Sequence, residues 1–199
     1  MTFNPIRTAV LATLAAGSLT AAACAPMDDM GGMVAADTSA TVMVGGAAMY
    51  PNRTIVENAV NSRDHTTLVA AVTAAGLVPT LSGPGPFTVF APTNGAFAKL
   101  PAGTVDSLVQ PANKATLTKI LTYHVVSGRV SAQDLIGRIR AGGGRAALTT
   151  VEGGVLTASL RGNAVILTDE KGGVATVTQA DVFQSNGVIH VTDTVSMPD

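Results

Sequence analysis

One segment constrains the fold more than any other, because it turns from a strand directly into a helix. The run GPFTVFAPTNGAFAKLP spans residues 85–101. Side chains of residues 87–91 alternate in the period-2 pattern that is typical of a strand. Pro92 interrupts strand pairing, and either Thr93 or Asn94 can cap the helix that follows. The sequence therefore predicts a strand and a short helix in immediate succession.

Two later segments accompany the first. NGVIHVTDTVSMP, residues 186–198, opens with Asn-Gly, a strong tight-turn signal, and continues as a β-branched strand. LTYHVVSGRV, residues 121–130, lies between the two strand runs. These three segments, in this order, resemble the fasciclin domain, a secreted module associated with cell adhesion. The resemblance covers residues 44–199 and implies a fasciclin-like fold, an antiparallel β wedge or sandwich flanked by several short helices.

The patterns elsewhere agree with an α+β fold. Asp64 is expected to cap a helix with its apolar stripe in residues 68–75, and Ser131 with Asp134 has capping-box spacing. Five strands separated mostly by glycine-bearing turns are expected at residues 147–151, 155–160, 164–167, 174–180 and 187–195. Helices in the first half and an antiparallel meander in the second define the α+β class. No internal repeat is visible, so we expect one domain over residues 49–199.

The apolar positions of these elements predict the core. We expect six side chains to be buried: Phe87, Phe90, Phe97, Leu121, Ile189 and Val191. His190 shares a strand face with Val188 and threonine hydroxyls, so we expect a packed, hydrogen-bonded histidine.

The N-terminus has the features of an export signal. Residues 1–7 carry one positive charge, and residues 8–23 are apolar and too short for a convincing membrane span. Cys24, the single cysteine, stands where a bacterial lipoprotein carries its lipid, although Ala21 replaces the usual bulky aliphatic residue. We therefore expect residues 1–24 to be a signal peptide and Cys24 to be lipidated; cleavage after Ala23 is the alternative. Residues 25–48, rich in Gly, Ala and Met, are expected to be a flexible tether.

Charge and composition restrict the partners. Without residues 1–24, which hold one basic residue and no acidic one, 11 basic residues face 13 acidic ones. This balance provides no electrostatic footprint for nucleic acid or an anionic membrane surface. We therefore expect no nucleic-acid partner and membrane association only through a lipid. The exported protein would lie in the cell envelope, the periplasm or outside the cell.

Catalytic motifs are missing from the sequence. It contains no G-x-S-x-G elbow, H-E-x-x-H pair or phosphate-binding loop. The three histidines, His65, His124 and His190, show no spacing that indicates a triad. We therefore expect a protein that is not an enzyme and needs no cofactor.

Tyr123 and His124 are the candidate partner-binding residues. In animal adhesion proteins built from fasciclin domains, a Tyr-His pair flanked by aliphatic residues is implicated in integrin binding, so the resemblance implies a protein, matrix or cell-surface partner here. The alternative is structural: Tyr123 packs inward, and His124 bonds to nearby carbonyls at a helix end. The favoured function is adhesion or envelope association by a lipid-anchored fasciclin domain.

A second function rests on three methionines. Met27, Met30 and Met33 follow the spacing M-x-x-M-x-x-M in the expected tether. Thioether sulfur suits Cu(I), so the alternative function is a small-ligand or copper-binding envelope protein. No histidine nearby completes such a site, and a tether that is merely rich in small residues and methionine explains the same pattern.

Overall fold

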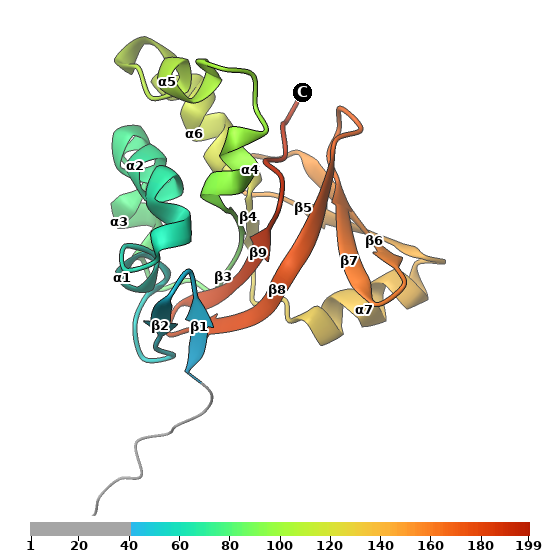
Figure 1. Cartoon of the computed structure of the whole chain (residues 1–199). Helices are drawn as coiled ribbons and strands as arrows, with labels where there is room; N and C mark the ends of the chain where they lie inside the picture. The colour runs from blue at the N-terminus through green and yellow to red at the C-terminus, as the bar shows by residue number, and fades with distance from the viewer. Residues whose placement is uncertain (1–40) are drawn as a thin grey trace, which may run out of the picture. The chain divides into compact units, whose positions relative to one another are not determined.

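Seven strands form one mixed sheet in the computed structural model, which describes residues 41–199 (Figure 1). Its order is β4-β3-β9-β8-β7-β6-β5, and β1 and β2 form a separate hairpin. The strands are β1 (Val42–Val44), β2 (Ala47–Met49), β3 (Phe87–Pro92), β4 (Val125–Ser127), β5 (Arg145–Thr149), β6 (Val155–Arg161), β7 (Ala164–Thr168), β8 (Val174–Gln184) and β9 (Gly187–Thr192). The helices are α1 (Ile55–Ala59), α2 (Thr66–Ala75), α3 (Val78–Leu81), α4 (Asn94–Ala98), α5 (Thr104–Leu108), α6 (Lys114–Tyr123) and α7 (Ala132–Ala141). The α+β prediction is confirmed.

One strand pair departs from the expected antiparallel arrangement. β3 and β9 run parallel, with Phe90 opposite His190, whereas the other neighbouring strands are antiparallel. Parallel neighbours need a long crossover connection, and the chain between β3 and β9 supplies one that contains α4 to α7 and five strands. Two of the three segments that carried the family resemblance, residues 85–101 and 186–198, therefore pair with each other as neighbouring strands in the sheet.

The edges of this sheet approach one another. Val126 in β4 forms an antiparallel bridge with Thr150, just after β5, and the Val151 amide donates to the Val125 carbonyl at 2.7 Å. Helix α7 packs against β5, β6 and β7, while α1 to α6 gather on the side of β3 and β9 (Figure 1). The sheet thereby curls almost into a barrel that is joined at one bridge.

Two hydrophobic clusters lie on opposite sides of the central strands. Because side chains alternate along a strand, Val89 and Ala91 of β3 join the cluster under α1 to α6, whereas Phe90 joins the cluster between the curled sheet and α7. Ile189 and Val191 of β9 belong to the first cluster. β3 and β9 therefore form a wall between the two clusters: β3 contributes residues to both, and His190 of β9 stacks on Phe90 of the second.

Five of the six predicted core residues are buried. Phe90, Phe97, Leu121, Ile189 and Val191 are each at most 7% exposed. The prediction for Phe87 is wrong: its side chain is only partly buried against the helix-side cluster. Phe87 is the first residue of β3, where fewer elements surround the strand.

The N-terminal hairpin corrects the extent of the expected tether. Residues 42–48, assigned to the tether, belong to the folded region, because β1 and β2 pair from Val42 opposite Met49 to Val44 opposite Ala47. Val44 and Met49 are buried in the helix-side cluster, whereas Met43 on the other face is 58% exposed. The hairpin is amphipathic, and the burial of one face accounts for its attachment to the domain.

The predicted helix caps are confirmed at two helices and wrong at a third. Thr93 caps α4 by accepting from the Ala96 amide at 3.2 Å, and the Ser131–Asp134 capping box has both of its bonds. The prediction that Asp64 caps α2 is wrong. Asp64 lies in a 3₁₀ turn (Arg63–His65), and the residue before α2, His65, makes no capping bond.

Candidate functional site

Tyr123 and His124 stand at the junction of α6 and β4. Tyr123 is the last residue of α6, and His124 is its C-cap. The His124 ring is 3% exposed and bonds at both nitrogens: Nδ1 lies 2.7 Å from the Ile120 carbonyl, and Nε2 accepts from the Ser196 amide at 3.0 Å. These partners require the proton on Nδ1. Burial lowers the pKa of His124, so the ring is a neutral connector between α6 and the C-terminal segment.

The Tyr123 side chain has no exposed surface and points into the barrel-side cluster. Its hydroxyl donates to the Val155 carbonyl at 2.9 Å and accepts from the Glu170 amide at 3.3 Å. Burial raises the pKa of Tyr123 to about 12, so the hydroxyl keeps the proton that it donates. Tyr123 therefore joins the end of α6 to the start of β6 and to the turn after β7.

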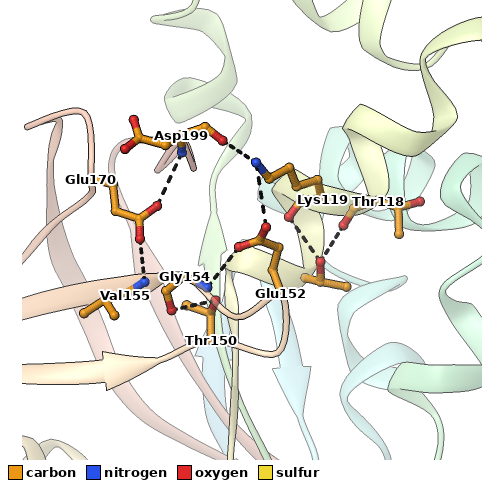
Figure 2. A network of polar contacts seen from close by, with 9 residues as sticks. Thr118, Lys119, Thr150, Glu152, Gly154, Val155, Glu170 and Asp199 are labelled. Carbon is orange, nitrogen blue, oxygen red and sulfur yellow. Dashed lines mark hydrogen bonds and ion pairs between the residues drawn. The ribbon is translucent and has the colours of Figure 1, made fainter.

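A polar network joins the same elements (Figure 2). The Glu170 carboxylate accepts from the Val155 amide at 2.9 Å and from the Asp199 amide at 3.4 Å. Lys119 of α6 pairs with Glu152 at 3.8 Å and donates to the Asp199 carbonyl. The C-terminus is thus attached to α6 through Lys119 and to the turn after β7 through Glu170.

Burial corrects the predicted partner contact. Side chains with 0% and 3% exposure cannot touch a second macromolecule while the domain keeps this conformation. Tyr123 and His124 instead have the structural role that was the alternative. Tyr123 and His124 can affect the binding of a partner only indirectly, through the shape of the surface that they support.

His190 matches its prediction of a packed, hydrogen-bonded residue. It is fully buried and stacks on Phe90, with ring centroids 5.5 Å apart. Its Nε2 lies 2.9 Å from the Val130 carbonyl, and its Nδ1 accepts from the Asp181 amide at 3.4 Å. His190 therefore connects β9 to the segment that enters α7.

An apolar cavity of about 310 Å³ lies on the other side of the central strands, between α1 to α3 and the sheet. Its walls are mostly Val, Leu, Ile and Ala side chains from these helices and from β3, β8 and β9. His65 also lines it, 3% exposed. This space could not be predicted from the sequence, because residues that line a cavity and residues that fill a core have the same apolar periodicity.

The lipidation and copper predictions lie outside the described residues. Cys24, Met27, Met30 and Met33 all fall in residues 1–40. Within residues 41–199, no three His, Cys, Asp or Glu side chains are grouped so as to hold a metal ion. Across that same range, none of the helices has the length and apolar character needed to cross a membrane.

The fold belongs to the class of α+β domains in which a curled mixed sheet has several helices on one side and a single helix on the other. Among solved structures, the fasciclin domain pair of the insect cell adhesion molecule fasciclin I matches 73% of this chain with a TM-score of 0.65 and 18% identity, and the chain spans about half (51%) of that protein. The fasciclin domain profile matches residues 63–198. The chain belongs to the fasciclin domain family.

Two relatives of known sequence support this assignment. Protein sll1483 of Synechocystis is 49% identical over 165 residues, which cover 81% of this chain and 82% of the relative. Cell surface glycolipoprotein MPB83 of Mycobacterium bovis is 38% identical over 122 residues, covering 61% of this chain and 48% of the relative. Both similarities are with bacterial proteins.

Proposed function

We propose that this protein is an exported, non-enzymatic module for adhesion or envelope association, anchored by a lipid on Cys24. Membership of the fasciclin family carries the proposal, since a matched fasciclin protein is named as a cell adhesion molecule. The name of MPB83, a cell surface glycolipoprotein, supports the anchor. The partner is a protein or matrix component at a cell surface.

The outer face of the N-terminal hairpin is the surface that we assign to this partner. Tyr50, directly after β2, is 42% exposed, and the Arg53 guanidinium lies 4.8 Å from the centre of its ring. Met43 on β1 adds a 58% exposed apolar side chain. Tyr, Arg and Met are enriched at protein interfaces, and Tyr and Arg supply many of the residues that dominate binding energy.

Bead attachment tests this function. Beads coated with residues 25–199, which exclude the expected signal peptide and Cys24, are offered to bacterial cells and to extracellular matrix. Saturable attachment above uncoated beads is expected. It should fall in the double variant Tyr50→Ala and Arg53→Ala and persist in Phe183→Ala, a matched change at another exposed aromatic residue. Attachment equal to that of uncoated beads on every surface would overturn adhesion.

The lipid anchor has a separate test. The full chain is expressed in a bacterial host with radiolabelled palmitate, and the label is expected on the wild-type protein and not on Cys24→Ser. Wild-type protein should collect with the membranes and the variant with the soluble exported fraction. An unlabelled wild-type chain would show that Cys24 carries no lipid.

Copper binding is the second candidate, supported by the M-x-x-M-x-x-M spacing of Met27, Met30 and Met33. A Cu(I) titration of a peptide covering residues 25–46 tests it, with a peptide that has leucine at the three positions as control. Equal affinity of the two peptides would end this candidate.

A further inference from the structure

The cavity under α1 to α3 is too large to be an ordinary packing defect. Protein interiors are close-packed, and voids larger than a water molecule are few. The cavity measures about 310 Å³, which is at the lower end of the roughly 300–1,000 Å³ that small-molecule sites occupy. Apolar cavities are poor hosts for water, because water there finds few hydrogen-bond partners. The space is therefore suited to an apolar occupant.

The cavity reaches the surface beside α1. Val60, the C-cap of α1, lines it and is 54% exposed. Val56 and Val69, which also line it, are partly exposed. In contrast, Val72 and Val89 on its inner wall are at most 8% exposed. A ligand can thus enter beside Val60 and extend its apolar body toward β3.

Only one side-chain polar atom in the lining lacks a partner. Thr73 donates to the Val69 carbonyl at 2.8 Å, and both nitrogens of His124 are bonded. His65 bonds through Nδ1 to the Ser62 hydroxyl at 2.8 Å, while Nε2 has no partner at hydrogen-bonding geometry in residues 41–199. The Ala91 backbone lies near the ring but does not satisfy Nε2. A small shift of the ring would let Nε2 bond to a ligand.

The lining contains no Asp, Glu, Lys or Arg side chain. A carboxylate or ammonium group placed there would be buried without a counter-ion, at a cost of several kcal/mol. The His65 ring supplies no positive charge, because burial lowers its pKa. The lining therefore disfavours a fatty acid, whose carboxylate would lack a counter-ion, and favours a neutral molecule.

We propose that this cavity binds a neutral lipophile with one hydroxyl or carbonyl group, which bonds to His65 while the apolar body lies between α2 and β3. This role is additional to surface adhesion and uses a different part of the domain. The domain would thereby carry, or respond to, a small molecule that dissolves in membranes.

The fluorescent probe N-phenyl-1-naphthylamine, a neutral lipophile, tests the cavity directly. The chain contains no tryptophan, so protein emission does not obscure the probe. With residues 25–199 in detergent-free buffer, we expect a saturable rise in probe fluorescence. Val72→Phe fills the inner wall and should weaken probe binding roughly tenfold or more. Val174→Phe, the same change on an exposed strand position, should leave it unchanged.

Competition then tests the chemistry of the polar end. 1-Decanol and decanoate share a chain and differ in the charge of the head group. Decanol should displace the probe at a concentration roughly tenfold lower than decanoate at pH 7.5, and His65→Leu should reduce that advantage.

Three results would overturn the proposal. They are the lack of saturable probe binding by the wild-type chain, unchanged binding by a folded Val72→Phe variant, and displacement by decanoate at concentrations as low as those of decanol. Val69→Phe, nearer the mouth, replaces Val72→Phe if circular dichroism shows that the latter does not fold. Loss of bead attachment with retained probe binding would reject adhesion alone, so the two proposals fail separately.

Discussion

The Asn94 side chain accepts a hydrogen bond from the Thr67 backbone amide, with Oδ1 and N 3.0 Å apart. Thr67 lies in the first turn of α2, whose own N-cap residue makes no capping bond. Asn94 begins α4, and its Nδ2 also donates to the Arg63 carbonyl at 2.8 Å. One amide group therefore caps α2 from a different part of the chain and holds α2 against α4.

Variants of Asn94 should separate the contribution of its bond to Thr67 from that of its bond to Arg63. Asn94→Ala loses both bonds, and we expect the free energy of unfolding to fall by about 0.5–2 kcal/mol, the usual value of a helix cap. Asn94→Asp keeps an acceptor for Thr67 and should lose less. Urea unfolding followed by circular dichroism measures both. Equal losses in the two variants would show that the Arg63 contact matters more than the cap.

Two phenylalanines of β3 should differ in their contribution to stability. Phe90 is 1% exposed, so Phe90→Ala should lower the free energy of unfolding by about 3–5 kcal/mol. Phe87→Ala should cost clearly less, because that side chain is only partly buried. Chemical denaturation of the two variants side by side checks the order, and equal losses would contradict it.

Stability should fall in mild acid. Burial lowers the pKa of His65, His124 and His190 in the folded state, whereas the unfolded histidines titrate near their usual value of about 6.5. The unfolded chain therefore binds more protons below that pH. The contribution of the neutral rings to the free energy of unfolding is fully present above about pH 7. It is lost as pH falls through 6.5, by up to about 1.4 kcal/mol per pH unit for each histidine.

Urea unfolding between pH 5 and 7.5 measures this slope. His124→Gln should reduce it by about one proton. A slope that is the same in the variant and the wild type would mean that His124 becomes protonated without unfolding the domain.

Variants of the Tyr-His pair should change stability and leave attachment per folded molecule intact. Tyr123→Phe leaves the Val155 carbonyl and the Glu170 amide without their side-chain partner and should cost about 1–2 kcal/mol. His124→Ala removes a buried ring with two bonds and should cost roughly 2–4 kcal/mol. Thermal melting combined with bead attachment checks both. Lost attachment at unchanged melting temperature would restore the partner-contact interpretation.

Local chemistry was the part of the fold that the sequence could predict. The Ser131–Asp134 capping box, the Thr93 cap and the strand of residues 87–91 depend on neighbours within a few positions. The parallel pairing of β3 and β9 joins residues that are far apart in the chain, so no local pattern contains it. The cap of α2 failed for the same reason, because its acceptor, Asn94, comes from another helix.

Asn186 illustrates the same limit in a turn. Asn-Gly correctly marked the turn between β8 and β9. The sequence could not show that the Asn186 side chain accepts from the Ile55 amide at 3.0 Å and donates to the Leu81 carbonyl at 2.8 Å. The candidate site was harder still. The family resemblance indicated a binding motif at Tyr123 and His124, and only the three-dimensional arrangement shows that both side chains are buried.

The wall formed by β3 and β9 makes the two halves of the domain thermodynamically dependent on each other. β3 has one face in each hydrophobic cluster, and His190 of β9 stacks on Phe90 of the barrel-side cluster. If one cluster loses its packing, the other therefore loses part of its support. Residues 41–199 should unfold in a single transition. A molecule that fills the cavity beside α2 should therefore slow amide hydrogen exchange in β6, which does not line the cavity.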